Sequence, residues 1–269
     1  MVRVGERLCK TLMGRSGISS VEYAINPYLG CQHGCVYCYA RFMARWAGHA
    51  KEEWGSFVDV KVNALERLRH EAPRRRKGIV LLSSVTDPYQ PLERKYELTR
   101  GCLRILLEHQ FPISVLTKSD LVLRDLDLLK GFDECQVGFT ITAHDDEVRR
   151  VFEPGASAVD ARLAALHEIS DEGIPTYAFL GPILPHLSEE GLDSLLDELA
   201  GSVSHVLVDR LNVKSGNMKT IRDALSTNYP DLRSMFEVAL SPESGYYDSF
   251  RRRVAEMCRR RSIPCDIIF

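Results

Sequence analysis

The 269-residue sequence has no uninterrupted apolar run near the roughly 18 residues that a membrane span needs, and its first residues lack the apolar segment of a signal peptide. Its formal net charge is −2, so it has no overall attraction to nucleic acid or to a membrane. Aromatic residues make up only 8% of the chain, and none of its stretches interleaves them with basic residues as a base-stacking platform would. These absences predict a soluble cytoplasmic protein that has no membrane partner, and they do not indicate a nucleic-acid interface.

Apolar residues are plentiful, at 45% of the chain, which is enough for a sizeable core. Near-continuous apolar runs alternate with helical stripes, and such alternation is typical of an α/β fold with a parallel sheet buried on both faces. The helical stripes fall near 98–109, 159–169 and 192–199, and Ser157-x-x-Asp160 predicts a capping box at the start of the second. The runs that we predict as parallel strands are 56–62, 78–85, 112–118, 136–142, 175–181 and 204–213, after a short first strand near 21–26.

A closed eight-stranded barrel typically needs about 250 residues, and here about 20 N-terminal and about 45 C-terminal residues resemble extensions. We therefore predict a partial (β/α)6 TIM-type barrel with parallel strands and N- and C-terminal extensions. No linker divides residues 1–269, so we expect a single domain with a core at about 21–215 and a C-terminal helical extension at about 216–269. Chemistry in such barrels lies at the carboxyl ends of the strands, where this sequence places many polar residues. They are Ser83, Ser84, Thr86, Asp87, Tyr89, Gln90, Lys118, Ser119, Thr140, Thr142, His144, His186, Asp209, Asn212 and Lys214.

Three of the eight cysteines, Cys31, Cys35 and Cys38, stand within the stretch "CQHGCVYC". A structural zinc site usually has four ligands, but no second closely spaced cysteine pair exists, and His33 would be cramped inside the same loop. An iron–sulfur cluster held by three thiolates would instead keep one iron open to a small molecule. The residues alone leave three interpretations open: a zinc-stabilised binding module, an iron–sulfur electron carrier, and an enzyme whose cluster binds a small-molecule ligand.

The spacing Cys31-x3-Cys35-x2-Cys38, with aromatic Tyr37 before the last cysteine, resembles the signature of radical S-adenosylmethionine (SAM) enzymes. Five stretches between residues 25 and 185 narrow the resemblance to the spore photoproduct lyase-like subgroup. They are "INPYLGCQHGCVYCYAR", "TDPYQPLE", "VLTKSDLVLRDLDLL", "FEPGASAVDARLAALHEISDEGIP" and "GPILP".

The resemblance implies that the three cysteines hold a [4Fe–4S] cluster and that SAM binds the fourth iron. One-electron reduction would cleave SAM to methionine and a 5′-deoxyadenosyl radical, which abstracts hydrogen from the substrate. The electron would come from a small donor protein such as flavodoxin or ferredoxin. Neither the substrate nor a catalytic residue beyond the cofactors is implied, and nucleic acid stays open as an alternative substrate class.

The resemblance also implies a set of SAM contacts, although for Arg162 a solvated side chain is an equal alternative. The implied contacts are Tyr37 at the adenine; Ser83, Ser84 and Thr86 around the amino group; Lys118 at the carboxylate; Thr140 toward the ribose or carboxylate; and Arg162 from its helix.

One departure from the subgroup concerns the hydrogen-atom donor. The lyase places a cysteine in a "Cys-Thr-Ser-Asp" stretch, where this chain has "SSVTDPY" and puts Ser84 opposite that cysteine. Tyr37 and Tyr39 match the lyase's paired tyrosines, but they lack the thiol as a relay partner. We therefore predict a radical SAM enzyme that is not itself a spore photoproduct lyase.

Overall fold

The computed structural model describes residues 2–214 and 216–269, and its main feature is an eight-stranded sheet. The strands lie in the order β11, β10, β9, β8, β7, β6, β3, β2, and all neighbours are parallel except β2 and β3. The six consecutive parallel strands from β3 to β10 confirm the predicted α/β class and the partial barrel. Their bounds are β2 (Met13–Arg15), β3 (Tyr23–Ile25), β6 (Val80–Leu82), β7 (Ile113–Thr117), β8 (Cys135–Thr140), β9 (Thr176–Ile183), β10 (His205–Arg210) and β11 (Cys265–Ile267).

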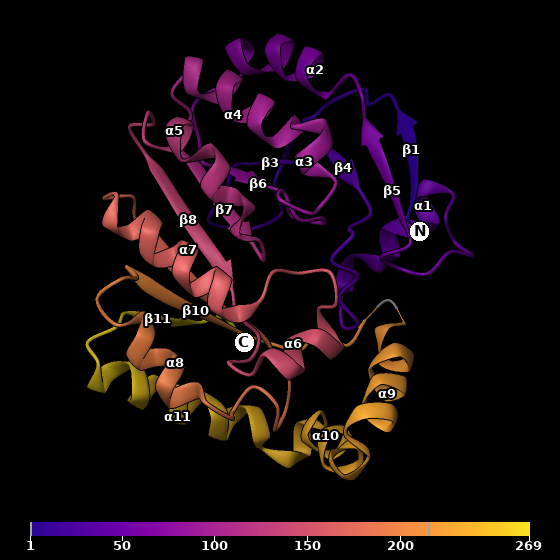
Figure 1. The fold of residues 1–269 in the computed structure, drawn as a ribbon, viewed down its shortest axis with the longest axis vertical. Coiled ribbons are helices and arrows are strands. Elements are labelled where there is room, and N and C mark those ends of the chain that lie inside the picture. Colours follow the sequence, from indigo (N-terminus) through magenta and orange to yellow (C-terminus); the bar gives the residue numbers. More distant parts are fainter. Residues whose placement is uncertain (1, 215) are drawn as a thin grey trace.

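Helices follow one another around the outside of this curved sheet (Figure 1). The predicted stripes become the buried faces of α4, α7 and α8, as their spacing requires. None of the helices in the described part of the chain combines the length and the apolar character that crossing a membrane requires. The α-helices are α2 (Ala64–Glu71), α3 (Glu93–Tyr96), α4 (Leu98–Glu108), α5 (Leu126–Leu129), α6 (Asp146–Phe152), α7 (Val159–Asp171) and α8 (Leu192–Leu199), with 3-10 turns at η2 (Ala72–Arg74) and η3 (Asp120–Asp125).

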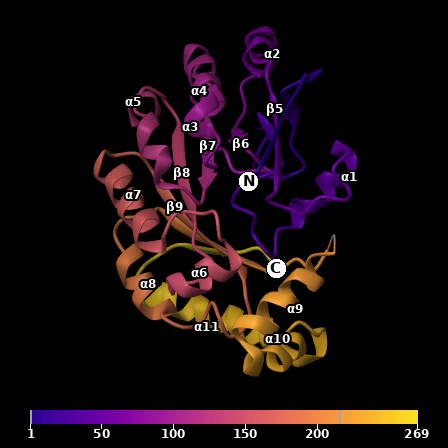
Figure 2. The same ribbon diagram turned by 45° about the vertical axis from the view of Figure 1, so that its right-hand side comes forward.

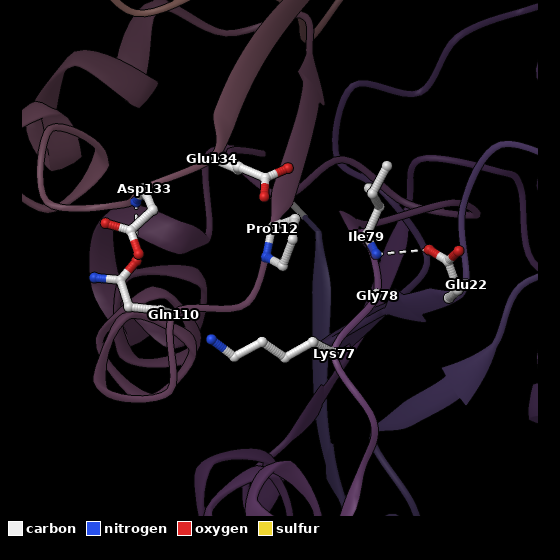
Figure 3. Close-up of a pocket in the computed structure, with 8 residues that line it drawn as sticks. All are labelled: Glu22, Lys77, Gly78, Ile79, Gln110, Pro112, Asp133 and Glu134. Atoms are coloured by element: carbon white, nitrogen blue, oxygen red, sulfur yellow. Dashed lines mark hydrogen bonds between the residues drawn. The ribbon is translucent and has the colours of Figure 1, made fainter.

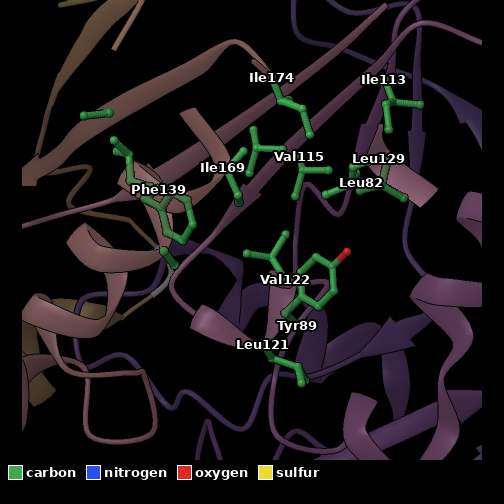
Figure 4. Close-up of a cluster of buried hydrophobic side chains, with 14 of the residues drawn as sticks. Leu82, Tyr89, Ile113, Val115, Leu121, Val122, Leu129, Phe139, Ile169 and Ile174 are labelled. Atoms are coloured by element: carbon green, nitrogen blue, oxygen red, sulfur yellow. The ribbon is translucent and has the colours of Figure 1, made fainter. Parts of the chain in front are cut away.

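The core between sheet and helices is continuous and apolar (Figure 4). Val115 of β7 and Phe139 of β8 lie there without solvent exposure, with Ile169 of α7 and Val122 of η3 packed in the same cluster. Because both faces of the central strands are covered or line the barrel, their sequences are nearly unbroken apolar runs.

Two local predictions are wrong. The run 56–62 forms β5 (Phe57–Lys61) of a separate sheet, where it lies between β1 (Arg3–Arg7) and β4 (Tyr28–Leu29). An apolar run predicts a buried strand, but the identity of its neighbours depends on contacts distant in sequence. The capping box of α7 does not form either, because the Ser157 hydroxyl donates to Asp120 (2.7 Å) and Asp146 accepts the Val159 amide (3.1 Å).

The C-terminal segment is helical only in part. It contains α9 (Asn217–Asn228), η4 (Pro230–Leu232), α10 (Arg233–Ala239), η5 (Pro242–Ser244) and α11 (Tyr246–Arg260), which gather at one end of the molecule in both views (Figures 1 and 2). It then ends in β11, which pairs with β10. The helical extension expected at about 216–269 thus contains helices but ends in a strand, and the single-domain division stays a prediction.

The amino ends of the strands carry a shallow hollow (Figure 3). Lys77, Gln110 and Glu134 line it, just before β6, β7 and β8. The basic run 74–77 lies at this end as well, which is the end opposite the cysteine loop and the polar strand ends. This hollow is therefore not the candidate site.

Candidate functional site

The three clustered cysteines lie on one loop between β4 and the turn η1 (Tyr39–Phe42), which continues into α1 (Met43–Ala47). Cys31 and Cys35 are buried, Cys38 is half-buried, and all three thiols are free. Gly30 enters the loop with φ +88°, where a Cβ would lie 2.4 Å from the carbonyl oxygen of Phe57. Only glycine fits this close approach without displacing backbone.

The loop after β6 holds the cysteine loop from one side. The Gln90 side chain accepts the Gln32 amide (3.0 Å) and donates to the Thr86 hydroxyl (2.9 Å), which itself donates to the Gly30 carbonyl (2.6 Å). Thr86, one of the predicted SAM contacts, therefore stabilises the cysteine loop here. Its contact with SAM stays a prediction.

The loop after α6, with the sequence "FEPGAS", holds the cysteine loop from the other side. The Val36 amide donates to Phe152 (2.9 Å), and the Gly155 amide donates to His33 (3.0 Å). A Cβ on Gly155 would lie 2.2 Å from the Gln32 carbonyl oxygen, so a side chain there would push the two loops apart. This packing explains the glycine in the motif.

A buried carboxylate, Glu153, connects the cysteine loop to the barrel. It accepts hydrogen bonds from the hydroxyls of Tyr37 and Thr142 and forms an ion pair with Arg162 (2.6 Å). Burial alone would raise the pKa of Glu153, but the charges of Arg162 and Lys118 and the bond from Tyr37 hold it at about 2. The side chain is therefore an anion that fixes the Tyr37 ring.

Arg162 is not solvated, so that alternative is wrong. Its guanidinium is fully buried and donates to the carbonyls of Ser157 (2.9 Å) and Thr140 (2.9 Å) in addition to pairing with Glu153. These bonds place Arg162 behind the strand end that carries Thr140. A direct contact of Arg162 or Thr140 with SAM stays a prediction.

Lys118 follows β7 on the same rim. Its ammonium lies 5.8 Å from the centre of the Tyr37 ring, and in residues 2–214 and 216–269 it has no hydrogen-bond or ion-pair partner. Burial would lower the pKa of Lys118, but the nearby Cys35, Glu153 and Asp87 raise it, so the side chain is cationic. Asp87 anchors this position by accepting the Lys118 amide (2.9 Å) and the Thr117 hydroxyl (2.7 Å).

Ser83 and Ser84 follow β6. Ser83 has φ +68°, and its buried hydroxyl has no partner in the described part of the chain. The Ser84 hydroxyl accepts from Asn26 (3.2 Å), and the Ser84 carbonyl accepts from the Tyr39 hydroxyl (2.5 Å). Ser83 is thus the serine with an uncommitted polar atom at the rim.

A second hollow opens beside Tyr39 and Ser84, at the edge of β2. It carries the cations Arg15 and Lys61, and none of its described lining residues is acidic. The lining residues are Thr11, Leu12, Gly14, Arg15, Ser16, Gly17, Ile18, Ala24, Asn26, Tyr39, Lys61, Ser84 and Val85.

Sequence reasoning missed two residues that organise the site, Glu153 and Asn217. The Asn217 amide donates to the Tyr37 carbonyl (2.8 Å) across 180 positions of sequence. Glu153 stands within the recognised "FEPGAS" stretch, so the motif contained a signal for it. Asn217 had none, because it lies outside every motif.

Comparison with known proteins decides the family. The model of the radical SAM superfamily matches residues 25–199. This chain belongs to the radical SAM superfamily. An uncharacterized protein of Methanocaldococcus jannaschii, MJ0683, is 37% identical over 80% of this chain and 79% of its own length. The uncharacterized protein Rv2578c of Mycobacterium tuberculosis is 30% identical over 97% of this chain and 82% of its own.

Among solved structures, a spore photoproduct lyase complexed with dinucleoside spore photoproduct superposes with a TM-score of 0.72. It is 18% identical and is matched over 98% of this chain and 81% of that one, which shows the shared fold. The family model confirms that the chain is a radical SAM enzyme.

Radical SAM enzymes use a [4Fe–4S] cluster and SAM, and the residues here fit both. Burial raises the pKa of the Cys31 thiol to about 12 and raises those of Cys35 and Cys38, so binding of a cluster by these thiols would have to release their protons. Three soft thiol donors on one loop beside a cationic lysine suit an iron–sulfur cluster. In the described residues no three His, Cys, Asp or Glu side chains converge as around a single ion. The three protein-bound irons of a cube occupy separate corners, so its thiolates need no such convergence.

Proposed function

We propose that this protein holds a [4Fe–4S] cluster with Cys31, Cys35 and Cys38 and uses SAM to abstract hydrogen from a substrate that is not spore photoproduct. The observation that carries the proposal is the position of the three-thiol loop. It is held at the carboxyl ends of the strands, beside the Lys118 ammonium, which has no partner among the described residues. When bound, the cluster and SAM supply a reducing electron and a 5′-deoxyadenosyl radical.

The residues of the chain bind and orient the cofactors. The Lys118 ammonium is available for the SAM carboxylate, and the Ser83 hydroxyl is available for the amino group. The Glu153 carboxylate fixes Tyr37, and Tyr37 is buried, so water is excluded from this side of the loop. The side-chain amide of Asn217, which begins α9 after the last barrel strand β10, donates to the Tyr37 carbonyl at the same rim.

The test of this function is SAM cleavage by the anaerobically reconstituted protein with dithionite. We expect methionine and 5′-deoxyadenosine, and we expect iron and sulfide rather than zinc in the purified protein. A cluster without SAM cleavage would support an electron carrier instead. A physiological donor such as flavodoxin or ferredoxin should replace dithionite.

Nucleic acid is the second substrate class that an observation favours, because the hollow beside Tyr39 and Ser84 is lined by Arg15 and Lys61 and by no described carboxylate. Fractions of cell extract are first tested for stimulation of 5′-deoxyadenosine formation in the SAM cleavage assay. The stimulating fractions are then treated with nuclease and tested again. Loss of stimulation would assign the substrate to nucleic acid, and full retention would exclude it.

We expect no repair of a synthetic spore photoproduct dinucleotide, although SAM should be cleaved. The O–H bond of Ser84 is far stronger than a thiol S–H bond, so Ser84 cannot readily return hydrogen to a carbon radical. The Tyr37 and Tyr39 hydroxyls already donate to Glu153 and to the Ser84 carbonyl. Product formation is followed chromatographically, with a spore photoproduct lyase as the positive control. Clean multiple-turnover conversion to thymines would prove the expectation wrong.

A further inference from the structure

The hollow beside Tyr39 and Ser84 holds two cations that no carboxylate of its lining neutralises. Its volume is about 350 Å³, which is within the range of small-molecule sites. Arg15 enters the hollow from the end of β2, and Lys61 enters it from the end of β5. Within residues 2–214 and 216–269, neither of the two side chains forms an ion pair. The hollow therefore has a positive charge balance of its own.

The Lys61 ammonium is held in place next to Ser84 by Asn26. It donates to the Asn26 carbonyl (2.6 Å). The Asn26 side chain accepts the amides of Ser84 (2.9 Å) and Val85 (3.1 Å) and donates to the Ser84 hydroxyl (3.2 Å). Burial lowers the pKa of Lys61, as expected for an ammonium that is partly withdrawn from water without a carboxylate partner. Because an ammonium has three N–H donors, Lys61 keeps donors for a ligand in the hollow.

The hollow at the amino ends of the strands has the opposite electrostatic character. It also contains a lysine, Lys77, but Glu22, Asp133 and Glu134 line it as well (Figure 3). These carboxylates outnumber the lysine, whereas the hollow beside Tyr39 has cations alone. A concave site lined by one sign of charge attracts ligands of the other sign, so the hollow beside Tyr39 favours an anion.

The anion that suits this hollow is not SAM. SAM carries an ammonium and a sulfonium beside its carboxylate, so its net charge is positive and the two cations would repel it. The hollow reaches Tyr39, which directly follows Cys38, so a molecule bound there would lie next to the cysteine loop. A site for an anion beside this loop therefore suits the substrate rather than the cofactor.

We propose that this hollow binds a phosphate group of the substrate through Arg15 and Lys61. A guanidinium pairs with phosphate through two parallel hydrogen bonds, and an ammonium binds it as a point charge. The hydroxyls of Thr11 and Ser16 also line the hollow and can donate to further phosphate oxygens. The inference rests on the proposed function and narrows its substrate to a phosphorylated compound, either a small phosphate ester or a nucleotide.

The experiment titrates the oxidised holoprotein at low salt with inorganic phosphate, ribose 5-phosphate and a thymine dinucleotide, followed by phosphorus nuclear magnetic resonance. We expect the wild type to bind these probes with an affinity that falls as sodium chloride is added. Arg15→Gln and Lys61→Gln should each weaken binding roughly tenfold, because each removes a charged hydrogen-bond donor. Lys77→Gln is the matched control, and it should bind the probes like the wild type because Lys77 belongs to the other hollow.

Arg15→Gln keeps the test decisive if Lys61→Gln does not fold, because Arg15 is exposed at the end of an edge strand. Tighter binding of ribose 5-phosphate than of the dinucleotide would assign the phosphate to a small molecule, and the reverse order would assign it to nucleic acid. Both results support the inference.

Two results would overturn the inference alone. They are failure of the wild type to bind any of the probes, and equal binding by the wild type and Arg15→Gln. SAM cleavage by the wild type would still uphold the proposed function in either case. A wild-type protein that bound the probes but neither bound iron nor cleaved SAM would overturn the proposed function, and with it the assignment of the phosphate to its substrate.

Discussion

Replacing Cys31, Cys35 or Cys38 with alanine is expected to abolish the broad visible absorbance and the bound iron of the reconstituted protein. Each thiolate would hold one iron corner, and the chain has no neighbouring thiol to substitute for it, because the other cysteines lie on other elements. Visible spectra and iron and sulfide analysis after anaerobic reconstitution measure the loss. Apoprotein circular dichroism should change little, since the cysteine loop is also held by Gln90 and Gly155.

The five other cysteines provide the matched controls for this prediction. Cys102 is fully buried on α4. Cys135 begins β8 at the amino ends of the strands, whereas the cysteine loop lies at their carboxyl ends. Single alanine replacements of these five residues should leave the cluster spectrum intact. Loss of the cluster in the Cys102 or Cys135 variant, without loss of folding, would indicate a fourth protein ligand and contradict an open iron. The controls are Cys9, Cys102, Cys135, Cys258 and Cys265.

Replacing Lys118 with methionine should weaken SAM binding without disturbing the cluster. Methionine keeps much of the side-chain length but removes the charge, and a hydrogen bond to a charged group is worth about 1.5–3 kcal/mol, or roughly 10- to 150-fold in affinity. The ammonium near Tyr37 has no described partner, so its loss should break no ion pair of the apoprotein. Equilibrium binding of SAM to the oxidised holoprotein measures the effect.

Lys130→Met is the control for this replacement. Lys130 follows α5 on the outside of the barrel and pairs there with Glu172, so its removal should leave SAM affinity unchanged. If Lys118→Met bound SAM as tightly as the wild type, the carboxylate of SAM would be held by another group.

Features that depend on neighbouring residues could be predicted well. The thiol spacing lies within eight positions, and the stripes of α4, α7 and α8 follow from helical periodicity. The polar rim was also predictable, because parallel strands necessarily place their carboxyl ends at one edge. Asp87 and Lys118 do meet there, because the Lys118 backbone amide donates a hydrogen bond to the Asp87 carboxylate.

Features that depend on distant partners could not be predicted. The run 56–62 was a strand, but its pairing with β1 and β4 placed it outside the barrel. Arg162 could be expected on its helix, whereas only the fold brings its guanidinium to the Thr140 carbonyl on β8. A charged residue is more often solvated than buried, so the sequence alone favoured no partner for it.

The sequence by itself determined the candidate thiol ligands, the α/β alternation and the family, because each depends on the spacing and composition of residues that are close together in the sequence. Only the tertiary structure decided which groups hold the cysteine loop and which remain free to bind. Glu153, Asn217 and Gly155 reach the loop across more than 100 positions of sequence. Such contacts form when the packing of the whole barrel outweighs the entropy cost of closing long loops. The periodicity of a short stretch of sequence therefore does not predict them.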